Sequence, residues 1–269
     1  MKNQPGALPS HLRGARRKET KSSRTHKQPK ILVSNWCDSR LKKAFDFVLA
    51  LSLILVALPL LLLIGLGVMM TSTGPMLFKQ VRLGKDGRPF KIYKFRTMEH
   101  DPARWASHIT IVGDPRITRF GRVLRKWKLD ELPQLINVLR GEMSFVGPRP
   151  RVPQQKQDSG LLLVRPGVTG MATLAFRHEE ALFEGLSVEQ IKEMYGTTIV
   201  PLKTQLDRSY LGQATMLTDM TLMYRTVLSV FKYSGPAPAN VEELADFCGS
   251  CAPENTQELH WSFDGAQGP

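Results

Sequence analysis

Cysteines are scarce in this chain of 269 residues, and their number argues against a fold held together by disulfides. Cys37 stands alone, and Cys248 and Cys251 form one C-x-x-C motif near the C-terminus. A four-ligand zinc site needs two further ligands, and the sequence has no second C-x-x-C motif. We expect the pair to lie in a polar tail without a metal, and redox or metal binding is the alternative.

Acidic residues are almost absent from the first 43 positions, where twelve Lys and Arg stand against Glu19 and Asp38. This stretch therefore carries +10 of the net charge of +13. Its polar, basic composition predicts a disordered tail over residues 1–40. The apolar segment follows too late, and without a small-residue cleavage pattern, for a signal peptide. A basic tail binds nucleic acid or an anionic lipid surface, and the apolar segment favours lipid.

Charged residues are also missing from positions 47–78, and positions 47–70 are almost continuously apolar. Twenty-four such residues are enough to cross a bilayer as a helix, and the alternative is a buried helix of a soluble protein. Pro59 lies at the middle of the segment, where it can break a helix. Both flanks are basic, so the positive-inside rule gives no direction. A hairpin that re-enters the same side of the membrane and a straight span both fit these residues.

Two short strands are predicted after this segment, over 76–84 and 88–98, joined by a turn at 84–88. Apolar residues at helical spacing predict a helix over 117–127. A second helix is predicted over 131–139 and is stopped by Gly141. The segment 142–170 reads as irregular, with turns at its Gly-Pro and Pro-Gly pairs. Further helices are predicted at 187–195, 201–212 and 217–232, before a polar C-terminal stretch.

The string LDELPQLINVLRGEMSFVGPRP, at 129–150, holds the residues best suited to chemistry. Asp130 occupies a predicted helix N-cap, with Pro133 in the first turn. A carboxylate there is a plausible nucleophile toward phosphorus, and Glu131 beside it could help to hold a divalent cation. On these two residues alone, ordinary helix capping is the favoured explanation.

Basic residues gather on both sides of this pair: Arg119, Arg122, Arg125, Lys126 and Lys128 before it, Arg149 and Arg151 after it. The planar guanidinium of arginine pairs well with phosphate oxygens. The stiff Gly-Pro-Arg-Pro turn at 147–150 would hold Arg149 in one direction, as a phosphate clamp requires. The alternative is a solvated basic face near a membrane.

With KIYKFRTM before it and VRPGVTG after it, this string resembles the bacterial sugar transferases of the monotopic phosphoglycosyl transferase superfamily, over about residues 42–231. The resemblance implies a re-entrant membrane helix, a cytoplasmic catalytic domain and a Mg²⁺ cofactor. It also implies a reaction in which an Asp attacks the β-phosphate of a UDP-sugar. UMP leaves, and undecaprenyl phosphate then takes the phosphosugar from the Asp. Such a step begins the assembly of an exopolysaccharide, a capsule, an O-antigen or a glycoconjugate.

Carried over by motif, the resemblance makes Asp130 the nucleophile and Glu131 its metal-binding neighbour. Arg125, Arg149 and Arg177 match the phosphate-binding arginines of the family. Pro59 matches the proline that breaks the membrane helix, although Leu58 stands where the family often has serine. The segment after Gly170 departs from the usual family form, so the sequence does not indicate which sugar is moved.

We therefore expect an α+β protein whose catalytic domain is mainly helical with a short β-hairpin. Its parts are a disordered tail (1–40), a re-entrant membrane helix (41–73), a catalytic domain (74–233) and a disordered C-terminal tail (234–269). We expect it at the inner membrane, with the catalytic domain on the cytoplasmic face and no nucleic-acid partner. The oligomeric state and the polymer stay open. The alternatives are a non-catalytic scaffold of a polysaccharide-assembly complex and a nucleic-acid-binding protein.

Overall fold

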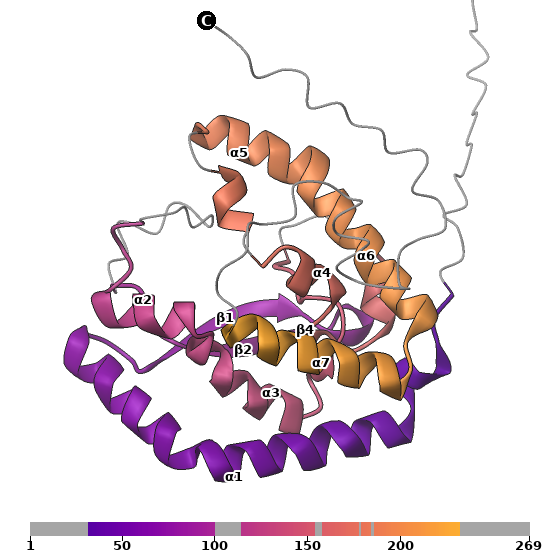
Figure 1. The fold of residues 1–269 in the computed structure, drawn as a ribbon, viewed down its shortest axis with the longest axis horizontal. Helices are drawn as coiled ribbons and strands as arrows, with labels where there is room; N and C mark the ends of the chain where they lie inside the picture. Colours follow the sequence, from indigo (N-terminus) through magenta and orange to yellow (C-terminus); the bar gives the residue numbers. More distant parts are fainter. Residues whose placement is uncertain (1–31, 100–113, 154–157, 178, 184–185, 232–269) are drawn as a thin grey trace, which may run out of the picture. The chain divides into compact units, whose positions relative to one another are not determined.

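A computed structural model describes residues 32–99, 114–153, 158–177, 179–183 and 186–231. These residues are mostly helical, with two small two-stranded sheets (Figure 1). The elements are α1 (Arg40–Thr71), β1 (Leu77–Leu83), β2 (Pro89–Phe95), α2 (Arg119–Lys126), α3 (Leu135–Leu139), β3 (Ser144–Val146), β4 (Gly167–Thr169), α4 (Met171–Ala175), α5 (Val188–Met194), α6 (Val200–Gln213) and α7 (Met216–Phe231). The predictions for residues 234–269, with Cys248 and Cys251, lie outside the described residues.

The apolar segment forms one helix, α1, which continues through Pro59. Ser39 caps its first turn by accepting a hydrogen bond from the backbone N–H of Lys42, at 3.1 Å. In Figure 1 the ribbon of α1 changes direction near its middle. The predicted helix is therefore confirmed, and its ribbon is bent (Figure 1).

A narrow stripe of α1 faces the rest of the protein along the whole helix. Its buried residues lie toward the two ends of the helix: Lys42, Asp46 and Ala50 in the first half, and Ile64, Gly65 and Val68 in the second. Half-buried Ile54, Ala57 and Leu61 lie between these two groups. Ala50 packs in the main core with Val138 and Leu211, and Ile64 packs with Leu124 and Phe95 in a second cluster. Both halves of α1 therefore lie against the same folded unit.

The other faces of α1 carry exposed apolar side chains, among them Val56, Leu62 and Met70. Only 11% of its most apolar 18-residue window is buried. A core helix of a soluble protein buries most of its apolar surface, so α1 does not fit that alternative. An exposed apolar surface of this length marks an interaction with a membrane or another protein.

The predicted hairpin is confirmed. Strands β1 and β2 pair antiparallel, from Leu77 opposite Phe95 to Leu83 opposite Pro89. The backbone N–H of Gly84 donates to the carbonyl oxygen of Arg88 at 2.9 Å and closes the loop between them. Phe90 and Ile92 of β2 pack in the main core, and Phe95 at the end of the strand packs in the second cluster.

Two expectations for the middle of the chain need correction. Residues 142–170 are not wholly irregular, because β3 and β4 pair in parallel there. Three-residue strands are too short to show an alternating pattern. The predicted helix over 131–139 is a 3-10 helix, Leu129–Gln134, followed by α3. Gly141, at a φ of 72°, ends this segment as expected.

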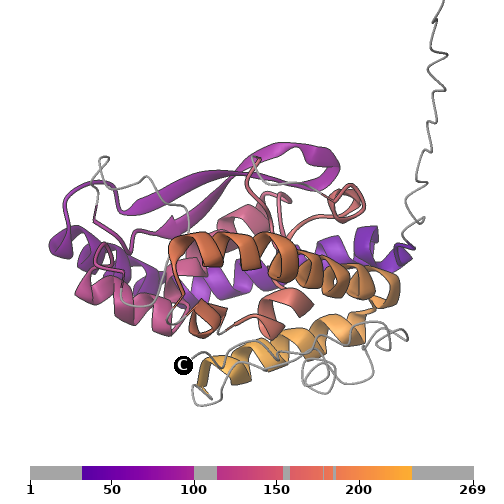
Figure 2. The ribbon, with the colours of Figure 1, turned by 90° about the horizontal axis from the view of Figure 1, so that it is seen from above.

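The C-terminal helices follow the prediction closely. A π-helical turn, Tyr195–Ile199, joins α5 to α6, so the two predicted helices form one continuous rod. Figure 2 shows the β1–β2 hairpin and α7 at opposite edges, with α6 and α1 between them. The short helix α4 was not predicted.

The predicted disordered tail also ends earlier than position 40. Residues Asn35–Asp38 form a 3-10 helix, and Cys37 within it is buried. The backbone N–H of Ser34 donates to Leu211 in α6 at 2.8 Å, and its hydroxyl donates to Ala214 at 2.6 Å. These bonds tie the start of the folded unit to its C-terminal helices.

Candidate active site

Glu131 lies between two cations that come from different parts of the chain. Its Oε1 atom is 2.7 Å from Nζ of Lys94, in β2, and 3.1 Å from Nη2 of Arg149, in the turn after β3. Burial raises the pKa of the Glu131 carboxyl, but the charges of Lys94 and Arg149 outweigh burial, and the pKa lies well below its usual range. Glu131 is therefore ionised and fixed in place.

Asp130, next to it, has a different environment. Its side chain is buried, with the residue 7% exposed. Its Oδ1 atom has no hydrogen-bond partner within the described ranges. Burial raises the pKa of this carboxyl, and the opposing charges of Lys94 and Arg125 do not restore it. A carboxylate with a free, poorly solvated oxygen beside several cations is suited to attack an electrophile that carries negative charge.

The local backbone explains how Asp130 is presented, and it corrects its predicted role as N-cap. Lys128 adopts the left-handed conformation, at a φ of 55°, between α2 and the 3-10 helix. Lys128 is thus the capping residue, and it makes no side-chain capping bond. Asp130 is the second residue of the 3-10 helix. Its carboxylate is not used as a cap, which leaves it available for other chemistry.

Two of the three predicted arginines lie near the acidic pair. Arg125, in the last turn of α2, donates from Nε to the hydroxyl of Thr97 at 2.9 Å, which directs its guanidinium. Arg149 contacts Glu131 directly, yet 46% of its side chain is exposed, so one face stays open to a ligand. Arg177 follows α4, and its backbone N–H donates to Leu174 at 3.3 Å. A phosphate contact by Arg177 stays a prediction.

Sequence reasoning missed two basic residues of the site, Lys94 and Arg82. Lys94 lies in the quoted string KIYKFRTM, but lysines are common on exposed strand faces and nothing local marks it. Arg82, in β1, donates to the carbonyl of Pro150 at 3.1 Å and to Gln80 at 2.6 Å. Burial, and then the charge of Arg149, lower the pKa of Arg82 to about 10. The mutual repulsion of these two guanidinium groups favours a bound anion near them.

The turn at 147–150, called the GPRP turn below, is supported by tight backbone packing. Gly147 donates to Thr169 at 3.0 Å, and Gly167 donates to Pro148 at 2.9 Å. A Cβ atom on Gly167 would lie 2.2 Å from the backbone nitrogen of Gly147. Only glycine permits this approach. The strings VGPRP and RPGVTG therefore form one structural unit.

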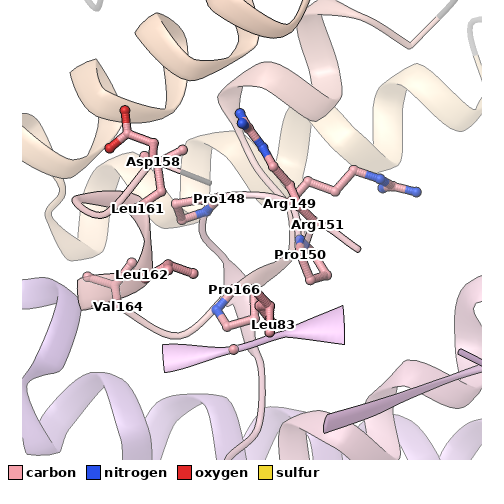
Figure 3. Close-up of a pocket in the computed structure, with 11 residues that line it drawn as sticks. Leu83, Pro148, Arg149, Pro150, Arg151, Asp158, Leu161, Leu162, Val164 and Pro166 are labelled. Carbon is pink, nitrogen blue, oxygen red and sulfur yellow. The ribbon is translucent and has the colours of Figure 1, made fainter. Parts of the chain in front are cut away.

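A small hollow opens beside the GPRP turn (Figure 3). Its walls include Leu83, Pro148, Leu162 and Val164. The side chains of Arg149 and Arg151 extend from the turn in different directions. Apolar walls beside arginines suit a ligand with a flat or apolar part and a negatively charged part.

Comparisons with known proteins agree on one family. The family model described as bacterial sugar transferase matches residues 37–233. Exopolysaccharide production protein PSS of Rhizobium leguminosarum bv. phaseoli is 37% identical over 211 residues, covering 71% of this chain and 96% of that protein. Undecaprenyl-phosphate glucose phosphotransferase of Komagataeibacter xylinus is 44% identical over 154 residues, covering 53% and 29%. UDP-glucose:undecaprenyl-phosphate glucose-1-phosphate transferase of Escherichia coli (strain K12) is 35% identical over 200 residues, covering 71% and 40%. The chain thus spans nearly all of the first relative and less than half of the other two.

Proposed function

Because the chain belongs to the bacterial sugar transferase family, we propose that it transfers a phosphosugar from a UDP-sugar to undecaprenyl phosphate and releases UMP. Two relatives are named for the transfer of glucose phosphate to undecaprenyl phosphate, and another is named for exopolysaccharide production, which supports the proposal. One observation carries the proposal: a buried Asp130 with an unpartnered oxygen stands beside Glu131, which two cations hold ionised.

In the first half-reaction, an oxygen of Asp130 attacks the β-phosphorus of the donor. An O–P bond forms to Asp130, the bond from that phosphorus to the bridging oxygen breaks, and UMP leaves with the electron pair. Lys94, Arg125 and Arg149 lie where their charges stabilise the attacked diphosphate. Glu131 holds Lys94 and Arg149 in place through one shared oxygen, Oε1.

In the second half-reaction, a phosphate oxygen of the lipid acceptor attacks the same phosphorus. The bond between that phosphorus and Asp130 breaks, and the carboxylate recovers its electron pair. One residue thereby serves both steps, and the product is a polyprenyl diphosphate sugar. Two half-reactions also let the soluble donor and the lipid acceptor use the site in turn.

We propose that the carboxylates of Glu131 and Asp130 could hold a magnesium ion. No cluster of three His, Cys, Asp or Glu side chains occurs in the part of the chain that the structure describes. Mg²⁺ needs none, because it commonly takes one or two carboxylates together with substrate phosphates and water. Lys94 and Arg149 both bind Oε1 of Glu131, so Glu131 would reach the ion through its other oxygen. Asp130 has an oxygen, Oδ1, without a hydrogen-bond partner among the described residues. When bound, the ion would neutralise charge on the diphosphate.

We further propose that α1 anchors the protein in one leaflet, re-enters the cytoplasmic side and does not span the membrane. Two features support this. Both halves of α1 pack on the same folded unit, whereas a straight span would carry one end away from it. The apolar faces of α1 that point away from the unit are exposed along its length. The site then lies close to the lipid that carries the acceptor.

The test is Asp130→Asn, with Asp86→Asn as the matched control. Asp86 is exposed, lies in the β1–β2 loop at a φ of 58°, and asparagine tolerates that conformation. Purified full-length protein is incubated with UDP-glucose or UDP-galactose labelled in the β-phosphate, first without acceptor. We expect label to be trapped on the wild type and on Asp86→Asn, and to be lost with Asp130→Asn. Turnover by Asp130→Asn at the wild-type rate would instead indicate direct displacement or another nucleophile. A folded protein inactive with every UDP-sugar would favour the scaffold alternative.

A further inference from the structure

Asp46 is a charged residue on the buried stripe of α1, one position before the uncharged segment begins. Its side chain is 2% exposed, and its partner Arg165 is 8% exposed. A buried carboxylate needs good partners, since an uncompensated one strongly destabilises a protein. Asp46 can therefore be buried only if both of its carboxylate oxygens have hydrogen-bond or ion-pair partners.

Both oxygens of Asp46 bind the small parallel sheet. Oδ1 accepts the backbone N–H of Phe145, in β3, at 3.2 Å. Oδ2 accepts from Nη2 of Arg165, two residues before β4, at 2.8 Å. Arg165 also donates from Nη1 to the carbonyl of Met143 at 3.2 Å. A single side chain of the apolar helix thus fixes both strands.

The sheet passes this constraint to the GPRP turn. Ser144 donates to Pro166 at 2.8 Å, and the bonds of Gly147 and Gly167 continue the pairing up to Pro148. A Cβ on Gly147 would lie 2.7 Å from the carbonyl oxygen of Arg165, so the backbones touch. Arg149 follows the end of β3 by three residues. A continuous series of hydrogen bonds and backbone contacts therefore connects Asp46 to the turn that carries Arg149.

We propose that Asp46 and Arg165 are positioning residues, which set the place of Arg149 in the active site from the membrane helix. The proposal rests on the proposed function for its effect on catalysis. In physical terms, α1 is part of the active-site scaffold as well as an anchor. A displacement of α1 relative to the rest of the folded unit would move the GPRP turn. The reason is that the carboxylate of Asp46 binds Phe145 in β3 and Arg165 just before β4.

The same stripe of α1 offers a matched control. Lys42, one turn before Asp46, is also buried and forms an ion pair with Asp219 in α7. Asp219 accepts further bonds from Trp36 at 2.8 Å and from Tyr210 at 2.7 Å. This pair joins α1 to α6 and α7. These helices reach the small sheet through a bond from Tyr210 to the carbonyl of Val146 in β3, at 3.3 Å, and a bond between the hydroxyls of Thr226 and Thr169 in β4, at 2.7 Å. Loss of Lys42 therefore weakens α1 without releasing the strands directly.

The first measurement is hydrogen exchange by mass spectrometry on full-length protein in lipid nanodiscs, which needs no activity. We expect Asp46→Asn to speed exchange of the amides at 144–149, because the strands lose their link. Lys42→Gln should leave those amides near wild type and speed exchange in α7. Arg165→Lys keeps the positive charge, but one amine cannot bind both Asp46 and the carbonyl of Met143 as the guanidinium does. We therefore expect it to speed exchange of the same amides, by less than Asp46→Asn does.

The second measurement is a double-mutant cycle on donor kinetics, with the UDP-sugar that gives turnover. We expect Asp46→Asn to lower kcat/KM by roughly ten- to a hundredfold, the range for a misplaced binding group. In a protein that already carries Arg149→Gln, Asp46→Asn should lower kcat/KM by less than about a further twofold, because both changes act through the side chain of Arg149. Lys42→Gln should add its full effect to Arg149→Gln.

The outcomes separate the two proposals. Unchanged exchange at 144–149 in both Asp46→Asn and Arg165→Lys overturns the positioning role. Faster exchange with fully additive kinetic losses also overturns it, because a general loss of stability would give that result. A wild type that is inactive with every donor, but shows the expected exchange pattern, rejects the proposed reaction and leaves the mechanical link between Asp46 and the turn intact.

Discussion

Asp130 and Glu131 are neighbours in sequence, but their surroundings move their pKa values in opposite directions. Burial dominates at Asp130 and raises its pKa. At Glu131 burial acts in the same sense, but the charges of Lys94 and Arg149 outweigh it and lower the pKa. Two carboxyls whose environments separate them in this way commonly have different roles in an active site. Here the less compensated group is the proposed nucleophile, and the ionised group organises the cations.

Asp207, in α6, is a third carboxyl with a changed pKa, and it allows a test at the residue scale. It is 3% exposed, and the backbone N–H groups of Arg149 and Ala172 lie beside it. Burial raises its pKa from 3.8 to about 7, against the charges of Arg151 and Lys203. The folded protein therefore binds a proton that the unfolded chain releases between these two values. Stability from this group is greatest below pH 4 and falls until about pH 7.

We expect Asp207→Asn to remove this dependence. The variant should melt at a higher temperature than the wild type, by an amount that grows from pH 5 to pH 7 and then levels. The matching gain in the free energy of unfolding has an upper bound of about 4 kcal/mol. Thermal unfolding in detergent at pH 5, 6, 7 and 8 measures the difference, and exposed Asp86→Asn is the control. If the difference between Asp207→Asn and the wild type does not change with pH, the carboxyl of Asp207 has the same pKa in the folded and the unfolded protein.

At the scale of elements, spacing in the sequence predicts some parts of the fold and cannot predict others. Apolar periodicity locates α2, α6 and α7, and the turn residues at 84–88 locate the hairpin. The β3–β4 pair leaves no such signal, because its strands have three residues each and pair across 20 intervening positions. The same limit applies at the site. Asp130, Glu131, Arg125 and Arg149 belong to motifs, whereas Lys94 reaches Glu131 only through strand pairing and packing.

The contact between Gly147 and Gly167 gives a prediction for this element. Gly167→Ala would place a Cβ 2.2 Å from the backbone nitrogen of Gly147, so the strands must separate. We expect a loss of about 1–3 kcal/mol or more in the free energy of unfolding, together with weaker donor binding because the GPRP turn shifts. Gly196→Ala is the control, since nothing lies within 4 Å of its added Cβ.

Chemical denaturation in detergent and the KM for the donor measure these effects. In the control, alanine at a helical site should stabilise the protein by about 0.5–1 kcal/mol. If Gly167→Ala and the wild type have the same free energy of unfolding and the same KM, then β3 and β4 accommodate the added methyl group without a loss of stability.

At the scale of the whole molecule, composition predicts a membrane helix but not its path. Basic flanks and Pro59 leave a hairpin and a span equally open. The packing of both halves of α1 on one folded unit is what favours the hairpin. The buried face of α1 is defined by the surface that it packs against. That surface combines nearer residues, such as Phe95 and Leu124, with Arg165 and Asp219, which lie 119 and 177 positions from their partners on α1.

Cysteine labelling tests this topology. Asn35→Cys and Arg88→Cys, each in a variant without the native cysteines, place exposed thiols on either side of α1. We expect both to be protected from an impermeant reagent in intact cells and to react once the membrane is permeabilised. Labelling of position 35 alone in intact cells would replace the hairpin by a true span.

The ion pairs of α1 also determine the order in which the protein can be completed during synthesis. Asp46 leaves the ribosome 119 residues before Arg165, and Lys42 leaves it 177 residues before Asp219. Until then, two charges at the edge of an apolar helix have no partners and favour the water-facing border of the bilayer. At about 5–20 residues per second, this wait lasts many seconds. In the proposed topology, these charges would keep the nascent helix at the membrane surface until the later segments cover them.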